Sequence, residues 1–175
     1  MPGARGARFP VVFCIEMGWI AMTNELYEKH CWALVDLDAM QSNLALIQKT
    51  VGAPVCCVVK ADAYGHGAIQ VSRKLEQLGA DYLAVSSIDE AMELRANGVS
   101  MPVLILGHTP KEQVGRLIEH HITQAVTCKA KALEYSHEAT ALGGTLKIHI
   151  KVDTGMSRLG FLVRDEHFAA GVEPL

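Results

Sequence analysis

The amino-acid sequence predicts an α/β protein in which strands and helices alternate around a parallel sheet. Five short apolar or β-branched runs recur along the chain, and one helical segment separates each run from the next. This alternation is the pattern of repeated strand–helix–strand units. The 175 residues are half hydrophobic and carry a net charge of -3, which is typical of about one globular domain.

The predicted strands are residues 54–59, 81–86, 102–107, 122–127 and 145–152. Apolar and polar side chains alternate in the last of them, so the two kinds point to opposite faces. The polar set is Lys147, His149, Lys151 and Asp153. Such alternation usually marks one solvent-facing side, but inside a closed barrel Lys151 and Asp153 would need partners.

The first three predicted helices have recognisable boundary signals. Asp38 with Gln41 opens a helix over residues 39–50, and a second helix over 67–77 runs to a glycine at position 79. Ser87 is the expected N-cap of the third helix, which a glycine at position 98 ends. Glu90 occupies the capping-box position of that helix.

The last two predicted helices follow the same logic. Thr109 is expected as an N-cap, Pro110 as the first helical residue and Glu112 as the box glutamate. The final helix covers residues 129–142 and stops at a pair of glycines. Together these elements fit two closures of the sheet, a doubly wound open sheet and a (β/α)8 barrel. No G-x-G-x-x-G follows the first strand, so a dinucleotide-binding fold has no support.

Charge and cysteine content exclude several functional classes. The 16 basic residues form no cluster, which argues against nucleic acid or an anionic membrane as the main partner. The five cysteines are odd in number and lack a paired C-x-x-C spacing, so neither a disulfide framework nor a zinc site is expected. Cys56 and Cys57 lie in an apolar run and are expected to be buried free thiols, which suits a reducing compartment.

The N-terminal residues stand apart from the repeating pattern. Residues 1–21 contain two arginines and then an apolar stretch that Glu16 interrupts, without a clear cleavage site. The stretch is also too short to span a membrane. We therefore expect residues 1–21 to be an extension outside the fold and residues 22–175 to form the domain.

Lysine 60 lies where an apolar strand meets a glycine-containing turn, in the segment VVKADAYGHG. In both closures, chemistry gathers at the carboxyl ends of the strands. Arg158, after the last predicted strand, is expected at the same edge. A desolvated lysine can form a Schiff base and an arginine can bind a carboxylate, so the pair suits an anionic small molecule. Solvent-facing loop residues in salt bridges are the alternative, which spacing leaves open.

Two segments, VVKADAYGHG and KVDTGMSRLGF, occur in this order and resemble the signature segments of the alanine racemase family. Residues 32–39 also match the family's W-x-x-V-D-L-D-A segment. The resemblance covers residues 31–161 and implies a (β/α)8 TIM-type barrel that binds pyridoxal 5'-phosphate (PLP), followed by a β-rich domain. Asp62 stands where many members carry asparagine.

The resemblance also implies roles for four residues. Lys60 would hold PLP as an imine and then act as a base on one face of the substrate Cα. Tyr64 would hydrogen-bond the cofactor phosphate, and Arg158 would lie near the cofactor ring oxygen and the substrate carboxylate. Lys151 matches a position that some members carboxylate to a carbamate, which would orient the arginine. No metal is implied.

Only about five of eight strand–helix units are counted before the chain stops, and the β-rich domain is absent, so we expect the N-terminal part of a longer racemase. The family's second base, a tyrosine contributed across a dimer interface, has no counterpart after Tyr135. The expected activity is interconversion of L- and D-alanine for cell-wall precursors by a cytoplasmic homodimer. The alternatives are a non-catalytic PLP-binding barrel protein and a serine or broad-specificity racemase of the same fold.

Overall fold

The structure, a computed structural model, describes residues 33–163. Contacts divide the chain into two units, residues 1–53 and 54–175. The extension expected over residues 1–21, and two of the five cysteines, Cys14 and Cys31, lie outside the described residues.

The described part of the first unit is one helix, α1 (Leu37–Val51). Its N-cap is Asp36, whose carboxylate accepts hydrogen bonds from the backbone N–H groups of Asp38 and Ala39 at 2.9 and 3.0 Å. The sequence prediction that Asp38 opens the helix is therefore wrong. Asp36 has the extended backbone that an N-cap needs, whereas Asp38 already belongs to the first helical turn.

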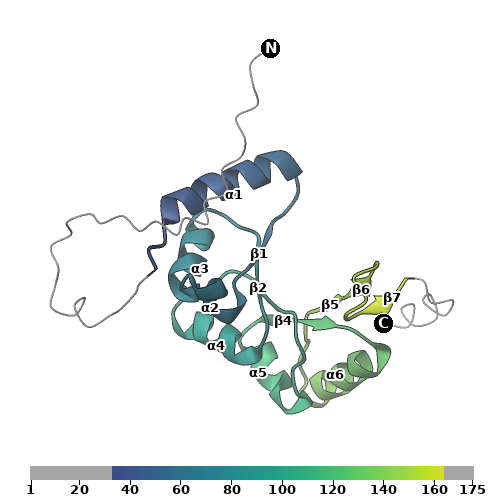
Figure 1. Ribbon diagram of the computed structural model, residues 1–175. Coiled ribbons are helices and arrows are strands. Elements are labelled where there is room, and N and C mark those ends of the chain that lie inside the picture. Colours follow the sequence, from purple (N-terminus) through teal and green to yellow (C-terminus); the bar gives the residue numbers. More distant parts are fainter. Residues whose placement is uncertain (1–32, 164–175) are drawn as a thin grey trace. The chain divides into compact units, whose positions relative to one another are not determined.

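The second unit contains a five-stranded parallel sheet, drawn in Figure 1. The strands are β1 (Cys56–Val58), β2 (Tyr82–Val85), β3 (Val103–Ile105), β4 (Ile122–Val126) and β5 (Ile148–Ile150). Their spatial order is the order of the sequence, without the reversal that defines a doubly wound sheet. The order decides between the two closures and confirms consecutive units of a (β/α) barrel.

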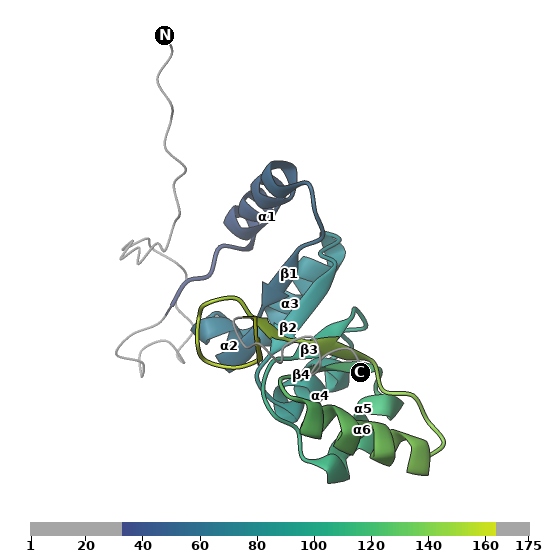
Figure 2. The same cartoon turned by 90° about the vertical axis from the view of Figure 1, so that its right-hand side faces the viewer.

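Helices follow each of the first four strands. They are α2 (Lys60–Gly65), α3 (Ala68–Gln77), α4 (Ile88–Ala96), a 3₁₀ turn η2 (Lys111–Gln113), α5 (Val114–Glu119) and α6 (Lys129–Ala141). Right-handed crossovers between sequential parallel strands place the helices on the same side of the sheet. Figures 1 and 2 show α3 to α6 along this side.

Apolar side chains pack on both faces of the sheet. On the helix-covered face, Val114, Val126, Ala132, Tyr135 and Ala139 form one buried cluster. On the other face, here called the open face, Ala84, Leu104 and Ala125 form a second cluster.

The open face becomes exposed at the edge strand β1. Cys56 and Val58 pair with Tyr82 and Ala84 in the parallel register and so share their face. Val58 is 42% exposed. Cys56 is exposed as well, so the prediction that its thiol is buried is wrong. The thiol lies on an edge strand that no further strand covers among the described residues.

Thr109 does not cap a helix, contrary to the sequence prediction. Its hydroxyl is buried and donates to the Gln124 Oε1 at 2.6 Å. Pro110 keeps an extended ψ of 143°, so helical structure begins only with the 3₁₀ turn at Lys111. The hydroxyl of Tyr135 completes this network by donating to the Thr109 carbonyl at 2.7 Å. Burial raises the pKa of Tyr135, so the phenol is the neutral donor near pH 7.

We predict that Tyr135→Phe destabilises the chain by about 1 kcal/mol, because the buried Thr109 carbonyl loses its donor. The measurement is the urea midpoint of unfolding. Tyr64→Phe is the matched control, since that side chain is 61% exposed, and its midpoint should not move. Equal midpoints for Tyr135→Phe and the parent would contradict the role given to this hydroxyl.

Candidate active site

Lysine 60 follows β1 directly, at the carboxyl edge of the sheet. The backbone N–H of Val59 donates to the Ala84 carbonyl at 2.8 Å, which extends the pairing of β1 and β2 up to the lysine. Val59 itself is buried at 2% exposure, so the backbone that carries Lys60 is anchored on one side. The lysine side chain is half-buried.

The segment α2 that follows is a left-handed turn and not a regular right-handed α-helix. Ala61, Asp62, Ala63 and Tyr64 all have φ between +51 and +55° and ψ between 38 and 53°. The left-handed region costs a residue with a Cβ roughly 1–2 kcal/mol. Four such residues in succession therefore require surrounding contacts that hold them there, and strain of this kind is concentrated at functional sites.

Glu90 of α4 holds the beginning of the turn. Its Oε1 accepts from the Ala61 N–H at 2.8 Å, and its Oε2 accepts from the N–H and hydroxyl of Ser86 at 2.7 and 2.8 Å. Burial raises the pKa of Glu90, but these hydrogen bonds outweigh burial, so the pKa lies below its usual range. The side chain is therefore an anion at neutral pH.

The N-terminus of α4 has the expected N-cap and gives Glu90 a further role. Ser87 is the N-cap, and its hydroxyl oxygen accepts from the Glu90 N–H at 3.3 Å. The carboxylate of Glu90 bonds to Ala61 and Ser86, and a hydrogen bond from the Ser87 backbone N–H also lowers its pKa, as a capping box requires. The glutamate thus links the second strand–helix unit to the lysine turn of the first.

Asp62 holds the end of the turn. Its Oδ1 accepts from the Ala68 N–H at 2.6 Å, which satisfies a free donor in the first turn of α3. An asparagine oxygen could accept the same hydrogen bond. This geometry explains in physical terms why aspartate and asparagine can both serve at position 62.

Gly65 and Gly67 shape the exit from the turn. Their φ angles are +82 and +87°, a region that favours glycine. At Gly65 a Cβ would meet no atom within 4 Å, so the backbone conformation, not crowding, requires glycine. Between them, the His66 ring contacts the Ala63 carbonyl through Nδ1 at 2.9 Å.

The turn brings Lys60 and Tyr64 together. The lysine Nζ lies 5.9 Å from the centroid of the Tyr64 ring, within the distance at which a cation is attracted to an aromatic face. Tyr64 is 61% exposed, so its hydroxyl is available to a bound molecule.

Arg158 lies in a loop that Asp153 organises. The buried Asp153 carboxylate accepts from the backbone N–H groups of Ser157, Gly155 and Arg158 at 3.0, 2.9 and 3.0 Å. The loop leaves from β6 (Val152–Asp153) and returns as β7 (Phe161–Leu162), which pairs with β6 in parallel. A Cβ on Gly160 would lie 2.6 Å from the Lys151 carbonyl, so only glycine fits that return.

Lys151 and Arg158 come from the far side of the sheet relative to Lys60. Lys151 follows β5, whereas Lys60 follows β1, and these two strands are the opposite edges of the sheet. The Lys151 N–H donates to the Val126 carbonyl at 2.9 Å, and the side chain is half-buried. All three cations therefore follow strands at their carboxyl ends, and Lys60 lies close to the Tyr64 ring.

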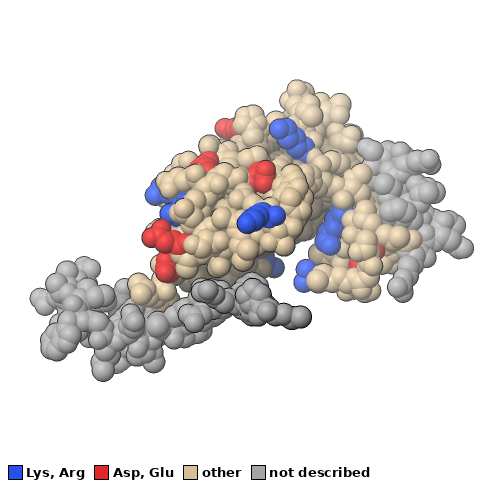
Figure 3. Space-filling view, turned by 90° about the horizontal axis from the view of Figure 1, so that it is seen from above, with Lys and Arg blue, Asp and Glu red and all other residues tan. Residues whose placement is uncertain are grey.

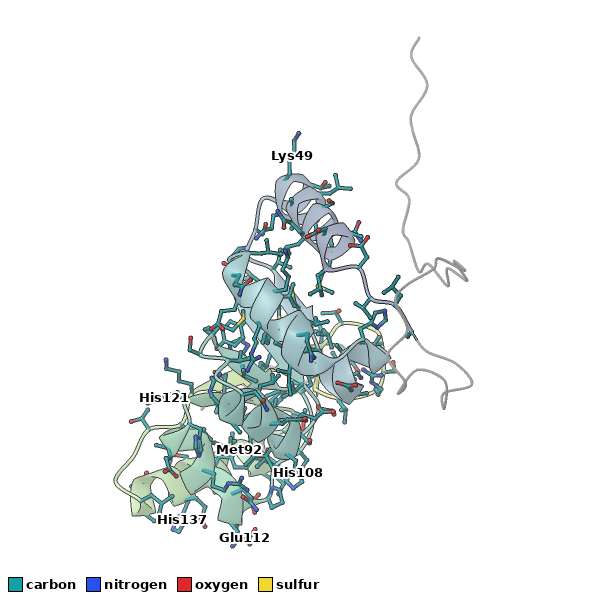
Figure 4. The ribbon with its side chains drawn as sticks, turned by 90° about the vertical axis from the view of Figure 1, so that its left-hand side faces the viewer. Lys49, Met92, His108, Glu112, His121 and His137 are labelled. Atoms are coloured by element: carbon teal, nitrogen blue, oxygen red, sulfur yellow. The ribbon has the colours of Figure 1, made fainter. Side chains whose placement is uncertain are left out.

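Histidines and carboxylates form no metal site among residues 33–163. No group of three or more His, Cys, Asp or Glu there could hold a metal ion, and Figure 4 shows His108, His121 and His137 well apart. On the face drawn in Figure 3, basic side chains lie at several separate places. None of the helices in this described part is long and apolar enough to cross a bilayer.

The hydrogen-bonding roles of two site residues, Glu90 and Asp153, are not predicted by the sequence patterns. The sequence pattern predicts Glu90 at a capping-box position, but not that its carboxylate also accepts from Ala61, 29 residues away in sequence. Asp153 was identified only as a polar residue in an alternating strand. A short acidic residue followed by Thr-Gly is typical of turns in which a side chain accepts backbone N–H groups, and that pattern could have located it.

We predict that Asp62→Ala destabilises α3 and lowers the stability of the chain by about 0.5–2 kcal/mol, because a capping acceptor is lost. Asp62→Asn is the matched control and should retain most of the stability, since it keeps an acceptor oxygen. Urea unfolding of the three proteins measures the difference. Equal losses in the alanine and asparagine variants would show that the hydrogen bond to Ala68 is not what matters.

We predict that the Arg158 loop is sensitive to acid. The N–H groups of Ser157 and Gly155, with that of Arg158, hold the pKa of Asp153 below its usual range. A lowered pKa stabilises the folded loop fully above the usual value of about 4, and this contribution is lost as pH falls below it toward the lowered pKa. The Ser157 amide resonance should therefore titrate with a midpoint below about pH 4 and stop titrating in Asp153→Asn. A midpoint at or above that value would contradict the prediction.

Known proteins resemble this chain over most of its length. A family model described as alanine racemase, N-terminal domain, matches residues 35–173. The alanine racemase of Desulfovibrio desulfuricans is 42% identical over 146 residues, which are 82% of this chain and 39% of that protein. The chain therefore spans well under half the length of this curated relative.

Solved structures resemble the chain in fold as well. The alanine racemase of Clostridium difficile 630 in complex with cycloserine has a TM-score of 0.71 and 40% identity, over 77% of this chain and 37% of that one. The histidine racemase of Leuconostoc mesenteroides has a TM-score of 0.67 and 31% identity, over 72% of this chain and 34% of that one. The motifs around Lys60 and Arg158 are thus part of a match that covers the sheet as a whole, and the chain belongs to the alanine racemase N-terminal domain family.

Proposed function

We propose that this chain provides the cofactor lysine of a PLP-dependent alanine racemase, and that Lys60 is this lysine. The observation that carries the proposal is the position of Lys60. It ends an edge strand at the carboxyl side of the sheet and begins a strained left-handed turn that two carboxylates hold. The curated relative with 42% identity is named alanine racemase, which supports the same activity here.

The donor groups at this edge suit PLP chemically. An aldehyde reacts with a primary amine, which Lys60 offers, and a phosphate accepts a hydrogen bond from a phenol, which the exposed Tyr64 offers. The open face beside β1 leaves space next to the lysine, because Val58 is 42% exposed there. When bound, PLP supplies an electron sink that stabilises negative charge at the substrate Cα.

The protein residues would supply proton transfer and orientation. Lys60 Nζ would remove or return the proton at one face of Cα. The Arg158 guanidinium offers a planar pair of donors for a carboxylate or a phenolate oxygen, and Lys151 beneath its loop is proposed to be carboxylated and to orient it. Racemisation needs a second acid–base group on the opposite face, which we assign to the partner in a homodimer.

We propose alanine as the substrate and the cytoplasm as the location. The names of the curated relatives support alanine. A structure with 31% identity is named histidine racemase, so the fold also serves another amino acid in that protein. Selectivity among amino acids therefore has to be measured on this chain.

We predict that borohydride reduction after incubation with PLP places a pyridoxyl group mainly on Lys60. Peptide mapping of the reduced protein locates the label, and Lys60→Ala should abolish it. Lys147→Ala is the matched control, because Lys147 is an exposed lysine next to a strand, and its loss should leave the label on Lys60 in place.

Label spread over surface lysines, or unchanged in Lys60→Ala, would overturn the assignment of Lys60. Selective label without interconversion of L- and D-alanine by the chain would restrict the proposal to cofactor binding.

A further inference from the structure

We propose that Glu90 is a positioning residue, which fixes the direction of Lys60 by holding the backbone of the turn that follows it. The proposal deepens the function proposed above and rests on Lys60 being the cofactor lysine. Glu90 belongs to a helix of the second strand–helix unit and has no role in the chemistry assigned so far.

The geometry gives Glu90 a specific task. Its carboxylate accepts three hydrogen bonds with two oxygens, one from Ala61 and two from Ser86. Ser86 immediately follows β2, and Ala61 immediately follows Lys60. One side chain therefore connects the end of β2 to the residue next to the lysine.

Loss of the Glu90 carboxylate would directly affect the backbone next to Lys60. The Ala61 N–H is the donor at the first left-handed residue, where the chain turns out of the extended strand. Without Glu90 that N–H lacks its acceptor, and the strained turn loses one of its two carboxylate anchors. A shift of about 1 Å in a reacting group is enough to cost about 100-fold in rate.

The same chain contains a matched comparison. Glu76, at the C-terminal end of α3, accepts from the N–H and hydroxyl of Ser100 and from the N–H of Met101 at 2.9, 2.6 and 2.7 Å. These residues precede β3 and therefore lie at the amino ends of the strands, whereas Lys60 lies at the carboxyl end of β1. Both glutamates thus stabilise a loop by accepting from a serine and a neighbouring N–H, but only Glu90 is bonded to the lysine turn.

The experiment compares Glu90→Ala, Glu90→Gln and Glu76→Ala with the parent chain. The first readout is the rate of pyridoxyl labelling of Lys60 with PLP and borohydride, relative to the label on all other lysines. The second is amide hydrogen exchange of Ala61 in the protein without PLP. Circular dichroism checks that each variant is folded.

We expect Glu90→Ala to slow Lys60 labelling about 10- to 100-fold and to speed exchange of the Ala61 amide. Glu76→Ala should stay within about twofold of the parent in both, because distant sites act independently. Glu90→Gln should fall between them, since one amide oxygen can serve Ala61 or Ser86 but not both.

Labelling of Glu90→Ala at the parental rate would overturn the proposal, as would an equal loss in Glu76→Ala, which would indicate general destabilisation. Failure of the proposed function has a different signature, because the parent itself would then show no selective label on Lys60. In that case the positioning role falls with it, whatever the Ala61 amide does.

Discussion

The left-handed turn after β1 is the constraint on which the candidate site depends. Four residues with side chains adopt a conformation that costs each of them about 1–2 kcal/mol, a total comparable with a sizeable part of the stability of an ordinary domain. The structure offsets this cost locally. Glu90 accepts the first N–H of the turn, the Val59 carbonyl accepts the Ala63 N–H at 2.9 Å, and Asp62 binds the helix that follows.

The electrostatics of the carboxyl edge follow from how its carboxylates are used. Glu90 and Asp153 are satisfied by backbone N–H groups and, for Glu90, a serine hydroxyl. These acceptors are occupied by neutral donors, and Asp153 also interacts electrostatically with Lys151. Among residues 33–163, neither Lys60 nor Arg158 belongs to an ion pair. This is the arrangement expected if the positive charges serve an anionic ligand.

Much of this architecture could be predicted from the sequence, because it depends on local patterns. The alternation of strands and helices, the N-cap Ser87 and the glycines after Tyr64 all follow from short-range rules. The left-handed turn could not be predicted, since Ala61, Ala63 and Tyr64 have no preference for positive φ. The prediction that Thr109 is an N-cap is wrong for a related reason. Its hydroxyl bonds to the buried amide of Gln124 instead, and only the tertiary structure brings these two residues together.

If Glu90 positions Lys60, the geometry of the lysine also depends on Ser87. Ser87 caps α4 by accepting the Glu90 N–H, so it fixes the backbone from which the Glu90 carboxylate reaches Ala61. The geometry of Lys60 therefore depends on two adjacent strand–helix units at once: β1 supplies the lysine, and the start of α4 supplies the anchor. A parallel sheet with sequential strand order places each strand end beside the next helix start, which is why a single glutamate can join them.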